Sequence, residues 1–541
     1  MIRRSRLPLF AVLACLCSAL AAPAWAQAGE PPILKVSPPA GAQVLKYRFG
    51  PIKVQPGQNL IDINVQTQRP SRNGWIVGFR PGLVDADSGR SPSVDVVHLH
   101  HAVWLVGEPG RGLRPVYAAG EEKTAFRAPP GFGWRYTTDQ TWLINHMLHD
   151  LVGSAHSVYI TYELWFIPDS APEAADITRI DTRWMDVEGL KPYPVFNAVR
   201  GTGGADRRFT FPDEATDPYP SSPPRNRWVV DRDATLVSTA GHLHPGGLWT
   251  DLKLTRNGRT VNLFRSRAHY YEPAGAVSWD VSMTATRPTW RVAVRKGDIL
   301  STSATYDTRS RSWYEVMGIM VVGMTQTPKG GVDPFTGKVD RRGVLTHGRL
   351  PENIDRGVGE PNPGLSNPLR LRNGPYVDRV VIRNFAFEQG DLSRRGTAGL
   401  PPAVRQGQQL EFVNADQPLT IRFHTITACR APCNRTGGIR YPLADGRVAF
   451  DSGELGFGPS IATSGVYESG DGRVPLTAAV PEPADPANCV GLSGSTKIIA
   501  NGCVGSASWK TPASLRPGTY TFFCRVHPFM RGAFRVVRSG G

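Results

Sequence analysis

The sequence predicts an all-β protein built from sandwiches of short strands. Apolar and polar residues alternate in segments such as 157–165, Ser-Val-Tyr-Ile-Thr-Tyr-Glu-Leu-Trp, as in strands with one buried face. The 57 Gly and 47 Pro indicate frequent turns, and no long amphipathic helix pattern is found. A chain of 541 residues is long enough for about three domains, each with its own core.

The first 26 residues have the layout of a cleavable secretory signal. Arg3 and Arg4 precede an apolar stretch, and Ala24-Trp-Ala26 precedes a polar segment. Two weaker alternatives are a lipoprotein acylation site at Cys15 and a twin-arginine signal. No other apolar run approaches the ~20 residues that a membrane span needs. We therefore expect a periplasmic or secreted protein with no membrane span.

Composition shifts divide the remaining chain into three β units. Residues 31–190 and 191–328 share a texture of strand patterns separated by Pro and Gly turns. Residues 329–375 are polar and rich in Pro, Gly and Asn, which predicts a linker. A third β unit is expected over 376–541.

The formal net charge of +16 raises the question of nucleic acid binding. The Lys and Arg residues are scattered, without a basic run or an interleaved aromatic platform, so no nucleic acid partner is expected. A basic exported protein with an acidic redox partner is the favoured interpretation.

All cysteines that remain after removal of the signal lie in the last quarter of the chain. In an oxidising compartment four of them can form two disulfides. We expect Cys429 to pair with Cys433 and Cys489 with Cys503, although spacing alone permits three connectivities. Cys524 is the odd cysteine.

Cys524 begins the segment Cys-Arg-Val-His527-Pro-Phe-Met530, which lies between two strand patterns. A type 1 copper site needs a thiolate, two imidazoles and a weak axial thioether. Cys524, His527 and Met530 supply three of these groups from one tight turn, and His424 supplies the second imidazole from the end of an earlier strand pattern. The alternative is a free thiol beside incidental His and Met residues.

This pattern resembles the cupredoxin family, and the loop looks most like the amicyanin type. The resemblance covers about residues 376–541 and implies a Greek-key β-sandwich that carries electrons. This sequence departs from the family pattern in one respect: a long Gly-rich insertion separates His424 from the ligand loop. A multicopper oxidase is disfavoured, because Phe523 and Arg525 stand where His-Cys-His would be required.

Three further histidine clusters precede this domain. The first is His98-Leu-His100-His101, the second contains His146 and His149, and the third is His242-Leu-His244. In a regular strand His98 and His100 share a face and His101 points the other way, so adjacent His100 and His101 can bind one ion only where the strand bends or ends. A chelating pair of His98 and His100 is the geometric alternative. For His242 and His244 the alternatives are a turn pair and a cupin site, which lacks its expected Glu.

Downstream features follow in an informative order: Asn257-Gly258, His269-Tyr270, Lys296-Gly-Asp298, Tyr306-Asp-Thr308 and Trp313-Tyr-Glu-Val-Met317-Gly318. Residues 40–326 resemble the copper type II, ascorbate-dependent monooxygenases, the family of peptidylglycine and dopamine hydroxylases. The resemblance implies two consecutive jelly-roll-like β-sandwiches that face each other across a solvent-filled cleft. Tyr270, Tyr306 and Glu315 are candidates for groups near the oxygen-activating site that orient substrate or protons.

The same resemblance implies two mononuclear type 2 coppers in addition to the type 1 copper. The electron-transfer copper is assigned to His100, His101 and His149, with His146 and His98 as alternatives. The oxygen-activating copper is assigned to His242, His244 and Met317. Two imidazoles and a soft thioether favour Cu(I) and leave a position open for O2. Met320 and Met324 are expected in the core.

The resulting hypothesis is an O2-dependent monooxygenase that hydroxylates a C–H bond of a small organic substrate. Its C-terminal domain would relay electrons from an external one-electron donor, either ascorbate or a redox protein. The animal enzymes carry many disulfides, whereas the two monooxygenase-like segments here contain no mature cysteine, which leaves the substrate class open. The alternatives are a non-catalytic copper-binding or electron-transfer protein and a structural β-sandwich protein with a cupredoxin domain appended.

Overall fold

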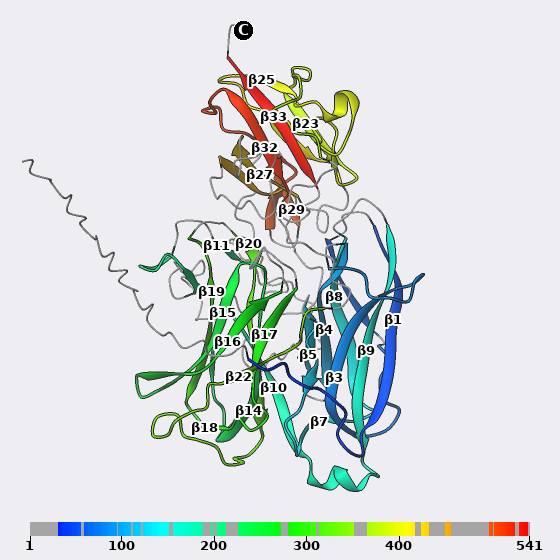
Figure 1. Ribbon diagram of the computed structural model, residues 1–541, viewed down its shortest axis with the longest axis vertical. Helices are drawn as coiled ribbons and strands as arrows, with labels where there is room; N and C mark the ends of the chain where they lie inside the picture. The colour runs from blue at the N-terminus through cyan, green and yellow to red at the C-terminus, as the bar shows by residue number, and fades with distance from the viewer. Residues whose placement is uncertain are drawn as a thin grey trace, which may run out of the picture.

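The computed structural model describes residues 31–538 apart from 56–58, 66, 95, 110–111, 121–122, 151–154, 188–195, 199–202, 213–225, 272–279, 310–312, 351–364, 417–423, 432–448, 456–496, 501–502 and 525–529. The described residues form strands and two short 3₁₀ helices, η1 (Pro172–Asp176) and η2 (Gly396–Gly399), which confirms the all-β prediction. Figure 1 shows two groups of strands side by side, with the C-terminal strands at one end. None of the described residues forms a helix of sufficient length and apolarity to cross a membrane.

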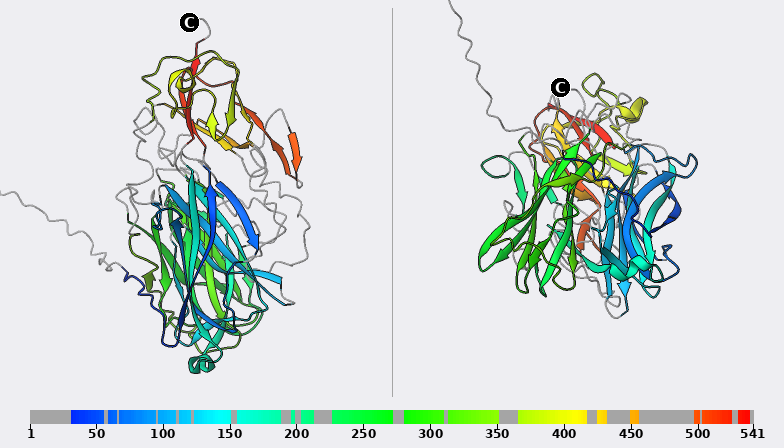
Figure 2. Two further views of the ribbon diagram at one scale, coloured as in Figure 1. Left: turned by 90° about the vertical axis from the view of Figure 1, so that its right-hand side faces the viewer. Right: turned by 60° about the horizontal axis from the view of Figure 1, so that its bottom comes forward.

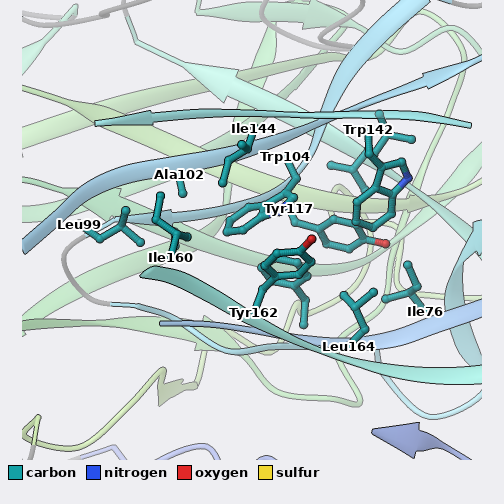
Figure 3. Close-up of a cluster of buried hydrophobic side chains, with 14 of the residues drawn as sticks. Ile76, Leu99, Ala102, Trp104, Tyr117, Trp142, Ile144, Ile160, Tyr162 and Leu164 are labelled. Carbon is teal, nitrogen blue, oxygen red and sulfur yellow. The ribbon is translucent and has the colours of Figure 1, made fainter. Parts of the chain in front are cut away.

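The first sandwich consists of two sheets packed face to face. One sheet contains β1 (Gln43–Val54), β9 (His156–Pro168), β3 (Gly74–Asp85), β7 (Phe132–Tyr136) and β6 (Phe126–Arg127), and the other contains β2 (Asn59–Val65), β8 (Thr141–Asp150), β4 (Val97–Glu108) and β5 (Gly112–Gly120). Figure 3 shows the core between them, where Trp104 packs against Tyr162 and Trp142 packs against Tyr117. The alternation predicted for 157–165 is observed in β9, whose residues Val158, Ile160 and Tyr162 are buried.

The second sandwich continues the larger sheet of the first. Its strands are β10 (Thr178–Asp186), β21 (Gly318–Thr325), β14 (Ala234–Leu243), β17 (Val281–Thr286), β16 (Arg259–Tyr270), β15 (Gly247–Arg256), β19 (Ile299–Tyr306), β12 (Phe209–Phe211), β13 (Arg227–Val229), β18 (Val292–Val294) and β22 (Gly343–Leu345). A separate pair is formed by β11 (Phe196–Ala198) and β20 (Trp313–Val316). Strand β10 joins the two halves, because it pairs with β7 at one end and with β21 along its length. Figure 2 shows both halves from below.

The segment predicted as a linker is only partly a connector. Its first part provides β22, which pairs with β17, and Asp333, whose carboxylate is bonded to Arg256. Its last part packs on the C-terminal domain, where the Arg535 guanidinium donates to the Pro368 carbonyl. Residues 329–350 are therefore part of the second sandwich.

The C-terminal domain is a third two-sheet unit. One sheet contains β24 (Ala386–Phe387), β23 (Arg379–Arg383), β26 (Glu411–Asn414) and β31 (Ser508–Lys510), and the other contains β25 (Ala403–Arg405), β33 (Arg531–Val537), β32 (Gly518–Phe523), β27 (His424–Arg430) and β28 (Phe450–Leu455). A hairpin is formed by β29 (Lys497–Ala500) and β30 (Cys503–Ser506). Phe412, Phe522 and Phe534 pack at the centre of the core.

Candidate functional site

A β-bulge at His100 places three histidines on one face of β4. Leu99 pairs with Leu148 and His101 pairs with Met147, so His100 is the extra residue of the bulge. Val97 and Leu99 before the bulge, and Ala102 and Trp104 after it, all face the core. His98, His100 and His101 therefore all face away from the core. This is the bend that adjacent His100 and His101 require if they are to bind one ion.

The register of β8 separates the two histidines considered as the third ligand. His149 is opposite His98 in the ladder, and its ring centroid lies 4.3 Å from that of His100. His146 is on the opposite face of β8, where its ring lies edge-on to Phe49 at 5.6 Å. The strand alternation thus places His149, and not His146, beside His100.

Hydrogen bonds fix the orientation of the imidazoles of His101 and His98. His101 Nε2 donates to Asn145 Oδ1 at 3.1 Å, so its lone pair is on Nδ1. That Nδ1 lies 3.4 Å from His100 Nδ1. An ion bonded to both atoms at about 2.05 Å would hold them at an angle of about 110°, which suits tetrahedral coordination. His98 Nδ1 donates to the Val94 carbonyl at 2.9 Å, a contact typical of histidines that bind metal through the other nitrogen.

The predicted ligands of the second sandwich lie on the face that meets the first. Met320, Val322 and Met324 face the core of the second sandwich, as predicted for the two methionines. Met317 has the opposite orientation and packs on Met147 and Ile319. His242 is opposite Ile319 in the ladder between β14 and β21, and its ring lies 5.4 Å from that of His244.

Tyr306 holds the backbones of His244 and Met317 together. Its buried hydroxyl accepts a hydrogen bond from the His244 N–H at 3.0 Å and donates to the Met317 carbonyl at 2.7 Å. Tyr270 donates its hydroxyl to the Gly247 carbonyl at 2.8 Å. Both hydroxyls bond to the backbone, so these contacts position the ligands' chain segments. The Glu315 side chain lies outside the described residues.

The two sets of predicted type 2 ligands meet directly. The ring centroid of His100 lies 4.7 Å from that of His244, at an interplanar angle of 79°. The side chains of Met147 and Met317 are in the same buried cluster, again one from each sandwich. The solvent-filled space that the family resemblance implies is thus closed at this point by imidazole and thioether groups.

Burial keeps these imidazoles neutral at physiological pH. Burial lowers the pKa of His98 to about 3 and that of His101 to about 4, although each ring has a hydrogen bond that opposes the shift. Burial lowers the pKa of His100 well below its usual value, and the neighbouring His149 and His244 rings add to the effect. Neutral imidazoles have a lone pair available for a metal ion without first losing a proton.

The described side chains are not arranged as a complete metal site. No group of three or more His, Cys, Asp or Glu residues in the described ranges is placed so that it could hold one ion. The donor types nevertheless fit copper, since imidazoles and a thioether are ligands it prefers. His146 adds a buried Nδ1 that has no hydrogen-bond partner among the described residues. Closing a three-ligand site would require side-chain rotation.

In the C-terminal domain the predicted thiolate and one imidazole are adjacent. Cys524 Sγ lies 3.9 Å from His424 Nδ1, and both residues are fully buried. Bonds of about 2.3 Å to sulfur and about 2.05 Å to nitrogen, at about 120°, would separate these atoms by about 3.8 Å. The Thr425 N–H donates to Cys524 Sγ at 3.3 Å. The pair therefore has the spacing that one ion between the two atoms requires.

The ends of the predicted ligand loop lie close together. The Cys524 N–H donates to the Met530 carbonyl at 3.1 Å, and the Met530 side chain is buried in the domain core. His527 lies outside the described residues, so the predicted second imidazole has no described position. Cys429 is disulfide-bonded, whereas Cys524 forms no disulfide. Cys433, Cys489 and the Cys503 side chain are outside the described residues, and the pairing stays a prediction.

Asp416 is a functional candidate that the sequence reasoning missed. Its buried carboxylate accepts a hydrogen bond from His424 Nε2 at 3.0 Å. It also accepts the N–H groups of Asn384 at 2.5 Å and Phe385 at 3.0 Å, two residues with positive φ. Burial acts to raise the Asp416 pKa, but the His424 hydrogen bond and these N–H groups outweigh it and lower the pKa. The only sequence signal was an Asp eight positions before His424.

Comparison with known proteins adds no family to these observations. No protein-family model matches the chain, and neither does any curated protein. Similar solved structures include PNGase F, a glycosylasparaginase from Flavobacterium meningosepticum, at 8% identity and a TM-score of 0.27, covering 53% of this chain and 98% of that chain. Recombinant N-glycanase F gives 10% identity and a TM-score of 0.25, with coverage of 53% and 97%. TM-scores this low carry no argument about fold or function.

Proposed function

We propose that this protein is an exported copper-dependent oxidoreductase, an O2-dependent monooxygenase that hydroxylates a C–H bond of a small organic substrate. The observation that carries the proposal is the contact between His100 and His244, at 4.7 Å between ring centroids. It brings together ligand sets from two sandwiches that were assigned separately. Burying polar imidazoles costs free energy, so a purely structural β-sandwich protein is not expected to place several of them between its domains.

Neighbouring residues position the ligands of the two predicted type 2 copper sites. The bulge directs the Nδ1 atoms of His100 and His101 to one position, and Asn145 holds the His101 ring in the required tautomer. Tyr306 fixes the chain at His244 and Met317. Copper held by these two sets would supply one-electron transfer and O2 activation. The surrounding apolar residues exclude water from the histidines of the first sandwich.

The C-terminal domain would act as the electron inlet. His424, Cys524, His527 and Met530 would hold the type 1 copper, and an external one-electron donor would reduce it. Asp416 orients the His424 ring so that Nδ1 faces Cys524 Sγ. The Thr425 N–H donates to the sulfur and so stabilises its thiolate form.

Copper stoichiometry and electron paramagnetic resonance of the oxidised, copper-loaded protein test the proposal. We expect three coppers per chain, one with a type 1 signal and two with type 2 signals. One blue copper alone would eliminate the monooxygenase proposal.

Met317→Leu should abolish reductant-dependent O2 consumption and keep the blue absorbance. The matched control is Met324→Leu, the same substitution at a core-facing methionine of β21, the strand that follows Met317, and it should keep both.

A second candidate is a non-catalytic copper-binding and electron-transfer protein. The observation that favours it is the direct contact between His100 and His244, because it closes the interface at the place where the resemblance implies a solvent-filled cleft. Under this alternative the three coppers would be bound and reduced, yet O2 consumption by the wild-type protein would equal that of Met317→Leu.

The export signal is tested separately, by sequencing the N-terminus of the mature protein, which should begin near Gln27.

A further inference from the structure

An open hollow lies on the outer face of the sheet β1-β9-β3, on the side of the first sandwich away from the predicted metal-binding histidines. Its volume is about 850 Å³. Small-molecule sites usually have volumes of about 300–1,000 Å³. No residue of the predicted metal sites lines it. The hollow is therefore a separate feature, independent of the proposed redox function.

Cationic side chains dominate the lining of this hollow. Lys46, Arg48, Arg80, Lys123 and Arg349 line it, and among the described lining residues Glu163 is the only carboxylate. Cations gathered around a concavity with protein walls strengthen the positive potential inside it. The hollow is thus suited to an anion with more than one charge.

The register of the sheet produces this charge pattern. Lys46, Glu163 and Arg80 are directly opposite one another across β1, β9 and β3. The Glu163 carboxylate accepts a hydrogen bond from the Trp165 indole at 2.9 Å. Neither Lys46 nor Arg80 forms an ion pair within the described part of the chain. Both cations are exposed and available to a ligand.

A segment of the second sandwich forms a fixed rim. The His347 N–H donates to Ser282 Oγ at 3.1 Å, and its carbonyl accepts the Tyr271 hydroxyl at 2.6 Å. The Leu350 N–H donates to Asp280 Oδ2 at 3.1 Å. This rim is part of the segment that was predicted as a linker. Its hydrogen bonds mean that the hollow is formed before any ligand binds.

The hollow adjoins a smaller cavity of about 140 Å³ between the two sandwiches. Leu34, Ala125 and Thr346 line both spaces. The smaller cavity is also lined by Trp134 and Val321, and cavities of about 150 Å³ can hold a benzene-sized group. A ligand with acidic groups in the hollow could therefore place a compact apolar part in this cavity.

The geometry points to a binding site for a small organic anion with at least two acidic groups, held by Lys46, Arg48 and Arg80. Two charge-assisted contacts would come from one row of the sheet, and Arg48 would add a third from two residues further along β1, on the same face. This site would function whether or not the protein binds copper.

Calorimetric titration of the full-length protein with citrate, at low ionic strength, tests the inference. The double variant Lys46→Gln/Arg80→Gln should bind citrate at least about tenfold more weakly, because two charge-assisted contacts are lost. The matched control is Lys53→Gln on the same strand, an exposed lysine that does not line the hollow; it should stay within about twofold of the wild type. All variants should keep the wild-type melting temperature.

Three outcomes would overturn the inference. These are absence of citrate binding by the wild-type protein, equal binding by the double variant, and an equal loss of binding in Lys53→Gln, which would mean that general basicity attracts the anion. Acetate, with one carboxylate, should bind at least about tenfold more weakly than citrate. Acetate binding as tight as citrate binding would contradict the requirement for two acidic groups.

Discussion

The imidazole of His100 packs edge-on against the imidazole of His244, although the two residues belong to different sandwiches. Neutral rings can make this contact without the repulsion that two imidazolium groups would suffer, and burial keeps the His100 ring neutral. Met147 and Met317, which form a buried cluster between the same two sandwiches, are uncharged as well. The part of the interface that holds these predicted ligands is therefore buried and uncharged.

Removing the Tyr306 hydroxyl should loosen the second predicted copper site. Tyr306→Phe leaves the buried His244 N–H and Met317 carbonyl without this partner, at a cost of about 1–3 kcal/mol in the free energy of unfolding. Urea unfolding measures the loss, and copper titration should show weaker binding at one type 2 site. Tyr271→Phe, which loses one hydroxyl contact to the His347 carbonyl and touches none of the predicted copper ligands, is the control and should keep all copper binding. Unchanged stability of Tyr306→Phe would contradict the role of its hydroxyl in holding the His244 and Met317 backbones together.

The turn after His244 depends on the absence of a side chain at Gly246. Its φ is +91°, and a Cβ there would lie 2.1 Å from Trp313 Cδ2. Gly246→Ala should lower the free energy of unfolding by about 3 kcal/mol, through backbone strain and displacement of the indole. Gly258 has a φ of +76° and open space around it, so Gly258→Ala measures the backbone strain alone. It should lower the free energy of unfolding by about 1 kcal/mol. Urea unfolding of both variants gives the difference, and equal losses would exclude the Trp313 contact as the cause.

Asp416 should tune the type 1 site through His424. Asp416→Asn removes the negative charge that supports the His424 ring, which should weaken copper binding about tenfold and raise the reduction potential of the blue copper. Spectroelectrochemistry measures the potential. Asp391→Asn changes another buried carboxylate of the same domain, one bonded to the Phe387 and Ser393 N–H groups, and should leave the potential unchanged. If both variants shifted the potential equally, the effect would be one of general domain stability.

Acid should weaken the contact between the sandwiches at Asp181. This carboxylate, on β10 of the second sandwich, is bonded to Arg179 at 3.1 Å and to Arg232 at 3.2 Å, and it lies 3.7 Å from the Arg114 guanidinium on β5 of the first sandwich. Burial acts to raise the pKa of Asp181, but Arg114 and Arg179 outweigh it and hold the pKa below its usual value. A lowered folded-state pKa gives a stabilisation that is complete above the unfolded-state value of about 4 and is lost as pH falls through the folded-state value.

The measurement is urea unfolding as a function of pH. Asp181→Asn should cost about 3 kcal/mol in the free energy of unfolding at pH 7, and this cost should shrink as pH falls through the folded-state pKa, because the wild-type carboxylate then becomes protonated. Asp206→Asn, at an exposed ion pair with Arg208, should cost less than about 1 kcal/mol across the same pH range. A loss for Asp181→Asn that did not change with pH would point to packing and not to charge as its origin.

The sequence by itself determined the β class, because strand alternation is a local pattern that each segment carries on its own. The buried residues of β9 follow that pattern. It also determined the closeness of Cys524 and Met530, since a short loop between two paired strands must bring its ends together. Met320 and Met324 were expected in the core, and strand alternation places both of them there.

Only the tertiary structure decided how the histidines are arranged. The bulge at His100 depends on the register of β4 against β8. The same register places His149 beside His100 and His146 on the opposite face of β8. The structure also extended the second sandwich to residue 350 and brought Asp416 to His424. These relationships join residues far apart in the chain, through ladder register and domain packing. Local periodicity has no means of encoding them, because a shift of one residue in pairing would move each imidazole to the other face.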